Sequence, residues 1–188
     1  GEWKCEIIDI KKNFLKAKSI SQISAPRVET LIDLMFSPIK YQNSESIIRH
    51  STEMGVRCLF PTSFKRTINT KINLDKFNTY AVGAAQQSGR LSIPNIDKLI
   101  HLKDRSNIVS GKTVLMFDEN LKGIHLSQAK IKPNSEILVV IGPEGGFEEE
   151  ERAFISDSSK NFFNVSLGPN ILKADTAVIA ALSLTFHY

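Results

Sequence analysis

Two glycine–proline loops carry the residues whose types and spacing could do chemistry. The first, Gly142-Pro143-Glu144-Gly145-Gly146, follows five apolar residues that are typical of a buried strand and precedes four glutamates that favour the start of a helix. Pro143 holds the residue before it out of the helical region, whereas Gly145 and Gly146 can take positive φ and let a ligand lie against the backbone. This order predicts a ligand site at the carboxyl end of a parallel strand, although an ordinary strand-to-helix turn would have the same outline.

The second loop repeats the order of strand, Gly-Pro, irregular segment and helix over residues 163–177. We expect Asp175 to be the N-cap, because its carboxylate can accept hydrogen bonds from free amides of the first turn. The helix over residues 177–184 is apolar nearly all round, so it should be buried on more than one side. One side can pack on the sheet, and the other needs more of this chain or a second subunit.

Strands and helices alternate along most of the remaining chain, which predicts an α/β domain with a mainly parallel sheet. Expected strands cover residues 3–10, 14–24, 30–36, 56–60 (closed by Pro61) and 113–117, and expected helices cover 44–54, 74–88 and, more briefly, 96–102. Residues 25–27 read as a linker. The two strands before it cannot form an independent domain by themselves.

Composition narrows the class of protein. The chain has 188 residues, 41% of them hydrophobic, which suits one domain with at most a small appendage. A net charge of +4 permits a nucleic-acid partner without requiring one. The two cysteines have no CxxC partner and the four histidines no ligand spacing, so we expect no metal site and a reducing, cytoplasmic compartment. No long apolar run indicates a membrane span, and no GxGxxG or GxxxxGK[ST] loop indicates a phosphate site.

The two glycine–proline motifs together, residues 141–147 and 167–177, resemble those of the RsmE family. These SPOUT-class enzymes use S-adenosylmethionine to methylate N3 of a uridine in 16S ribosomal RNA. The resemblance extends upstream through residues 37–40, 52–56, 63–66 and 84–90. It implies a SPOUT-type parallel sheet flanked by helices with a C-terminal deep trefoil knot, a homodimer, and 16S ribosomal RNA within the small subunit as partner.

The resemblance also implies a division of the chain. Relatives carry a PUA-like RNA-binding β-barrel ahead of the methyltransferase domain, and residues 1–24 look like its last strands. Most of that barrel is then missing from the sequence, and residues 25–188 are the methyltransferase domain.

The resemblance places the cofactor in the loops that follow three buried strands. The expected cofactor-binding residues are Phe117, Glu119, Ile141, Gly142, Pro143, Glu144, Gly145, Leu167, Gly168, Leu172 and Ala177. The expected catalytic residues are Lys173, Asp175 and Glu144; the alternative for Glu144 and for Lys173 is a solvated loop residue. The family pattern Leu-Arg-Thr-Glu-Thr-Ala reads Leu-Lys-Ala-Asp-Thr-Ala at 172–177, which keeps the charges but loses the guanidinium fork.

RNA contacts are expected from Lys40, Arg66, Gln87 and Arg90, each of which could instead be an ordinary solvated side chain. Three other functions stay open. The chain could be a SPOUT enzyme for another RNA, a non-catalytic RNA-binding or ribosome-assembly protein on the same fold, or an unrelated nucleotide-binding α/β protein.

Overall fold

The computed structural model describes residues 1–27, 30–39, 41–118, 120 and 122–188. Its main sheet has seven strands in the order β5-β4-β3-β8-β7-β9, with β6 beside β4, and every pair is parallel. The strands are β3 (Ile32–Phe36), β4 (Cys58–Ser63), β5 (Asn95–Ile96), β6 (Ile100–His101), β7 (Thr113–Phe117), β8 (Ile137–Ile141) and β9 (Asn161–Asn164).

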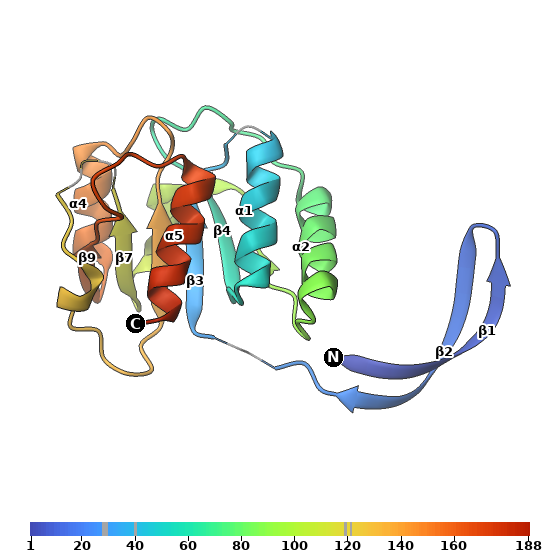
Figure 1. Cartoon of the computed structure of the whole chain (residues 1–188). Helices are drawn as coiled ribbons and strands as arrows, with labels where there is room; N and C mark the ends of the chain where they lie inside the picture. Colours follow the sequence, from blue (N-terminus) through green and yellow to red (C-terminus); the bar gives the residue numbers. More distant parts are fainter. Residues whose placement is uncertain (28–29, 40, 119, 121) are drawn as a thin grey trace.

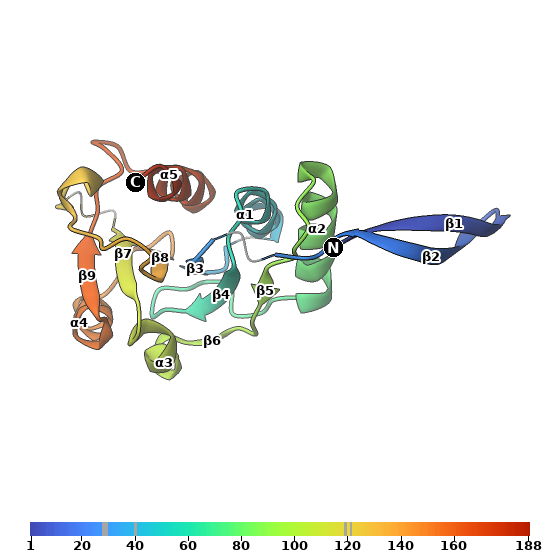
Figure 2. The same ribbon diagram turned by 90° about the horizontal axis from the view of Figure 1, so that it is seen from below.

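Helices cover both faces of this sheet, as Figures 1 and 2 show. On one face lie α1 (Tyr41–Glu53), α2 (Leu74–Ser88) and α5 (Ala174–Phe186), and on the other lie α3 (Ser106–Val109) and α4 (Glu149–Ser158). Short 3-10 turns occur at η1 (Leu102–Arg105) and η2 (Leu126–Gln128). The predicted α/β fold with a mainly parallel sheet flanked by helices is confirmed.

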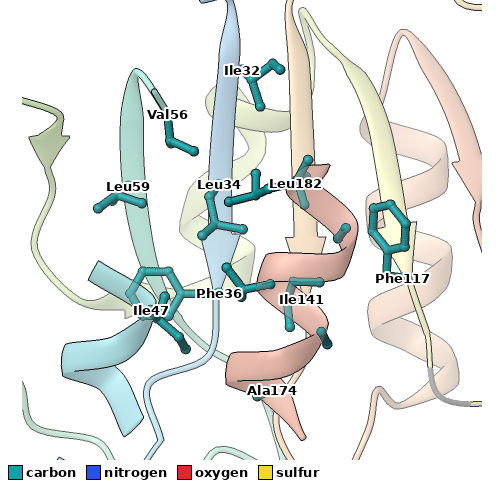
Figure 3. Packing of buried hydrophobic residues seen from close by; sticks show 14 of the residues in the cluster. Ile32, Leu34, Phe36, Ile47, Val56, Leu59, Phe117, Ile141, Ala174 and Leu182 are labelled. Carbon is teal, nitrogen blue, oxygen red and sulfur yellow. The ribbon is translucent and has the colours of Figure 1, made fainter. Parts of the chain in front are cut away.

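The central strands are buried on both faces, and their side chains alternate between two cores. Leu34, Phe36 and Ile141 point toward α1 and α5, where they meet Ile47 and Leu182 (Figure 3). The alternate strand positions, which include Met35, Val114, Met116, Leu138 and Val140, form the second core with Val109 of α3 and Ile155 of α4. Because the central strands are short, their carboxyl ends and the loops that follow lie at the edge of these two cores.

Two expectations about the edge of the sheet are wrong. Residues 96–102 are not a helix, because residues 95–96 and 100–101 pair with β4 as β5 and β6. Pro61 does not close β4, which continues to Ser63. The carbonyl oxygen of Pro61 accepts a hydrogen bond from Arg105. In a strand, the N–H of a residue points to the same side as its carbonyl, and on that side Pro61 lies between the segments paired with β5 and β6. No ladder hydrogen bond is needed there, so a residue without an N–H is tolerated.

The two N-terminal strands form a hairpin that projects away from the α/β part (Figures 1 and 2). β1 (Glu2–Lys11) and β2 (Phe14–Ser24) pair antiparallel, as expected from residues 3–10 and 14–24. Within the described residues, no helix is long and apolar enough to cross a membrane.

A buried carboxylate ties the amino ends of the central strands together. Asp33 in β3 is fully buried; its carboxylate accepts hydrogen bonds from Arg57 Nε and Nη2, at 2.9 and 2.8 Å, and from Lys112 Nζ at 2.5 Å. Burial would raise the pKa of the Asp33 carboxyl, but these hydrogen bonds outweigh it and hold the pKa below its usual value. The ionised group therefore stabilises the fold at neutral pH.

Asp33→Asn should lower the free energy of unfolding by about 2 kcal/mol at pH 7, because it leaves two cations beside a neutral amide while Arg57 can still reach water. The depressed pKa makes this contribution complete above the unfolded value of about 3.9 and progressively lost as the pH falls through the folded value. Urea unfolding should therefore show a gap between the free energies of unfolding of wild type and variant that is constant from pH 7 to about pH 5 and shrinks as the pH is lowered further, to about pH 3. The control is Asp9→Asn, which removes an exposed ion pair with Lys11 in the hairpin. It should change neither the free energy of unfolding at pH 7 nor its dependence on pH. A gap that stays constant with pH contradicts the assignment.

Candidate active site

A cavity of about 290 Å³ opens at the carboxyl ends of β7 and β8, beside the start of α5. Its wall combines three loops that are far apart in sequence: the one after β7, the first glycine–proline loop and the second. The lining residues are Phe117, Asp118, Ile141, Gly142, Pro143, Glu144, Leu167, Asn170, Ile171, Leu172, Lys173, Ala174 and Ala177. The predicted position of a ligand site, at the carboxyl edge of the parallel sheet, thus coincides with a real cavity.

The first glycine–proline loop is held by its own tight geometry. Gly146 has φ of 76°, a left-handed conformation that favours glycine, and its amide donates to the Pro143 carbonyl at 2.9 Å. A Cβ on Gly142 would lie 2.7 Å from the buried ring of Phe147, which packs edge-on against Phe64. The backbone therefore turns sharply after β8 and keeps Pro143 and Glu144 at the cavity.

Arg66 clamps the outer side of the same loop. Its Nη1 donates to the Gly145 carbonyl at 2.6 Å, and its Nε pairs with Glu148 at 2.9 Å. A Cβ on Gly145 would meet the Arg66 side chain at 3.3 Å, and Gly145 is not part of the cavity wall. The side chain that lies close against the Gly145 backbone is thus that of Arg66.

The second glycine–proline loop supplies backbone and apolar surface. Leu167, Ile171 and Leu172 line the cavity, and the backbone amides at 170–172 have no hydrogen-bond partner among the described residues. Gly168, in the left-handed region with φ of 109°, shapes the loop from outside the cavity wall. A flat apolar ligand group with polar edges fits between such side chains and such unpaired backbone.

The start of α5 differs from the expectation. The N-cap position is Lys173, and Asp175 lies in the first turn, where its carboxylate accepts from the neighbouring Thr176 amide at 2.9 Å. Asp175 is therefore not the cap, and it does not line the cavity, whereas Lys173 and Ala177 do. The helix begins at Ala174, three residues before its apolar run, and Ala174 is already buried against the core.

Three charged residues line the cavity. Glu144 and Lys173 both line it and are both exposed to solvent. Asp118 also lines it but is buried, and its carboxylate pairs with Arg152 of α4 at 2.5 Å. Sequence reasoning missed Asp118, Asn170, Ile171 and Ala174 as lining residues; the signal for Asp118 was its place directly after a buried strand.

The predicted RNA-binding residues are not brought together. Arg66 lies at the loop beside the cavity, whereas Gln87 is exposed near the end of α2. Arg90 donates to the carbonyls of Thr52 and Val56, which precede β4, so it lies at the amino edge of the sheet. Lys40 and Glu119 lie outside the described residues. No cluster of His, Cys, Asp or Glu able to hold a metal ion occurs in the described part of the chain.

Comparison with known proteins gives a consistent result. Residues 26–185 match the family model of the RNA methyltransferase domain. The ribosomal RNA small subunit methyltransferase E of Rickettsia conorii is 29% identical over 186 residues, covering 97% of this chain and 75% of its own. A Legionella pneumophila protein solved with bound S-adenosylmethionine has a TM-score of 0.83 at 26% identity, and covers 98% of this chain and 78% of its own. A methyltransferase E from Neisseria gonorrhoeae shares the fold, with a TM-score of 0.85 at 22% identity and the same coverage.

Proposed function

Because this chain belongs to the RsmE family of RNA methyltransferases, we propose that it methylates N3 of a uridine in small-subunit (16S) ribosomal RNA with S-adenosylmethionine as cofactor. The observation that carries the proposal is the cavity at the carboxyl edge of the sheet, built from both motif loops. We expect the enzyme to act in the cytoplasm on RNA within the small ribosomal subunit.

The residues of the cavity suit this cofactor. Ile141, Leu167 and Leu172 offer apolar surface for an adenine ring, and the unpaired amides at 170–172 offer donors for its edge. The Glu144 carboxylate in the wall suits a ligand that carries a sulfonium, whereas the charge of Asp118 is already paired with Arg152. When bound, S-adenosylmethionine would supply the methyl group to be transferred.

The chain's own residues must prepare the uridine. N3 carries a proton at neutral pH, and this proton has to leave before or during attack. Lys173 is the cation in the cavity wall, so we assign it to stabilise the negative charge that develops on the uracil. Glu144 lines the cavity and Asp175 does not, which favours Glu144 as the carboxylate that accepts the proton. The apolar wall limits water near the reacting atoms.

Nucleoside mass spectrometry of 16S ribosomal RNA tests the function. RNA from cells without this protein should lack one N3-methyluridine, and the purified protein with S-adenosylmethionine should restore it, on free RNA or on assembled subunits. The non-catalytic alternative predicts no methylation on either substrate. Calorimetric titration with S-adenosylmethionine separates the two further, since a pure RNA-binding protein has no need to bind it.

We propose that the C-terminal part forms the deep trefoil knot of the SPOUT class. β9 pairs with β7 near the sheet edge, whereas α5, the next element, packs against β8 and α1. The chain between them passes the loop after β7, where the Ile124 amide donates to Asn164 and the Ser166 amide to Ile124, both at 2.9 Å. Pulling the chain by its two ends should give a shorter final extension than 188 free residues allow; full extension contradicts the knot.

We propose that residues 1–24 belong to a PUA-like RNA-binding β-barrel and residues 25–188 to the methyltransferase domain. The hairpin exposes large apolar side chains on both faces, including Trp3, Ile7, Ile10, Phe14 and Ile20, each more than half exposed. Two strands cannot bury such residues by themselves, so further strands would have to cover them. A fragment of residues 25–188 should fold and bind S-adenosylmethionine; failure to do so contradicts the boundary.

The family's homodimer is also proposed for this chain, through the outer face of α5. Ala177, Val178, Ala181 and Leu182 are buried in the core, whereas Ile179 and Leu184, at the two margins of this buried face, remain 39% and 40% exposed. Exposed apolar side chains on the last helix suit a symmetric contact.

Light scattering at micromolar concentration should therefore give twice the 21.0 kDa of one chain. Ile179→Glu combined with Leu184→Glu should give the mass of one chain, because each would bury an unpaired carboxylate at the contact. Ile93→Glu, at an exposed isoleucine away from α5, should leave the mass unchanged. A wild-type protein with the mass of a single chain contradicts the dimer.

A further inference from the structure

A second cavity, of about 560 Å³, lies at the carboxyl edge of the sheet beside β4 and β6. Its wall includes Ser63 at the end of β4, Thr70 and Lys71 in the loop before α2, and Lys98 and His101 in the segment around β6. We call it the lysine groove. None of the residues predicted from the sequence to contact RNA belongs to it.

The lining of the lysine groove carries net positive charge. Lys71 and Lys98 are exposed, and neither forms an ion pair with another described residue. Among the residues that the structure describes, no carboxylate lines the groove; the neighbouring Asp97 pairs with the buried Arg105 and also interacts electrostatically with Lys98. A concave wall with two ammonium groups, two hydroxyls and an imidazole matches the oxygens of a phosphate group.

The groove is also held in place from beneath. Arg105 is 1% exposed, and its Nη2 donates to the carbonyls of Pro61 and Lys98 at 2.9 and 2.8 Å. β6 pairs with β4 so that His101 lies opposite Ser63. The segment that carries Lys98 is thus fixed to the sheet, which limits the conformational entropy that a ligand must remove on binding.

One loop connects the groove with the active-site cavity. The loop between β4 and α2 reaches the first glycine–proline loop through Arg66, and Ser37 after β3 is bonded to its Thr67 at 2.8 Å. A small hollow of about 40 Å³ between them is lined by Arg66, Ile68, Asn69, Pro143 and Glu144. Two residues further, the same loop contributes Lys71 to the groove. An RNA strand that places a base near Glu144 can therefore continue along this loop to the lysine groove.

We propose that the lysine groove binds the phosphodiester backbone of the substrate RNA next to the target nucleotide. This inference rests on the proposed RNA substrate and adds to it a contact surface outside the cofactor cavity. Phosphate contacts position RNA and make its binding salt-dependent, and they do not select a base sequence. The groove would thus set where the strand enters the active site.

The test is the salt dependence of binding to 16S ribosomal RNA, for wild type and for the double variant Lys71→Gln, Lys98→Gln. A plot of log affinity against log salt concentration has a negative slope, and the variant's slope should be less steep by about 1.4, which is about 0.7 for each lost contact with single-stranded RNA. Affinity near 0.15 M salt should be about tenfold weaker. The matched control is Lys130→Gln, Lys132→Gln, two exposed lysines before the amino end of β8, which should retain the wild-type slope.

Affinity for S-adenosylmethionine, measured by calorimetry, should be equal in all three proteins. A groove variant with the wild-type slope overturns the inference, as does a control variant that loses as much as the groove variant. A wild-type protein that binds RNA through the groove but methylates none would instead contradict the proposed function and leave the groove assignment standing.

Discussion

Lys173→Ala should reduce the single-turnover rate of RNA methylation by about 100-fold to 1000-fold while leaving S-adenosylmethionine binding within about twofold of wild type. Lys173 lines the cavity and is exposed to solvent, so its removal opens no void in the core. What it removes is the cation assigned to the negative charge on the deprotonated uracil. Because the negative charge on the uracil develops only during the reaction, the loss of Lys173 lowers the rate and does not change cofactor affinity.

Two further variants sharpen this prediction. Lys173→Arg restores the residue usual in the family and keeps the charge, so it should retain or raise the rate. Lys130→Ala removes a surface lysine remote from the cavity and should methylate as wild type does. If Lys173 is only a solvated loop cation, all of these proteins will react at the same rate, and an alanine variant as fast as wild type eliminates the catalytic role.

The sheet could be predicted from the sequence because its signals are local. The runs of apolar residues at Ile137–Ile141 and Val114–Phe117 are typical of strands buried on both faces in the centre of a parallel sheet, and both strands lie there. Gly55 and Gly89 likewise ended their helices as expected, both with left-handed φ. The sequence signal for each of these elements lies within the element or directly beside it.

The errors arose where tertiary contacts decide. Residues 95–96 and 100–101 have no strong strand pattern, and they are strands because β4 offers an open edge on which they pair. Pro61 lies within a strand because β5 and β6 leave an interval opposite it. Asp is a residue type that often caps helices, but Asp175 lies in the first turn, because the helix already begins at Ala174, which is buried against the core.

The candidate site was predicted in the same uneven way. Ile141, Leu167 and Leu172 were found from their place in the motif loops, and all three line the cavity. Asn170 and Ile171 were missed, since a loop residue gives no sequence signal for the direction it faces. That Gly145 contacts the ligand stays a prediction; within the protein, its neighbour is Arg66, 79 residues earlier in the chain, which its sequence position could not indicate.

The cofactor assignment itself makes the second large prediction. Ala177→Leu should weaken S-adenosylmethionine binding by at least about 100-fold, because it adds three carbon atoms at the wall of a cavity of about 290 Å³. Ala180→Leu is the matched control, since it makes the same change one turn later on α5 at a residue outside the cavity wall. Both variants keep a good helix former, so helix propensity cannot separate them.

Calorimetric titration gives the affinities, and thermal unfolding without cofactor shows whether each variant is folded. The expected pattern is two folded variants, of which only Ala177→Leu has lost binding and, with it, methylation. Overpacking of the core, to which Ala177 also contributes, would lower the unfolding temperature of the cofactor-free protein, whereas occupation of the cavity removes the increase in that temperature on adding S-adenosylmethionine. If Ala177→Leu remains folded and binds S-adenosylmethionine as tightly as Ala180→Leu does, the cofactor does not lie against the first turn of α5, and the cavity between the two glycine–proline loops is not its site.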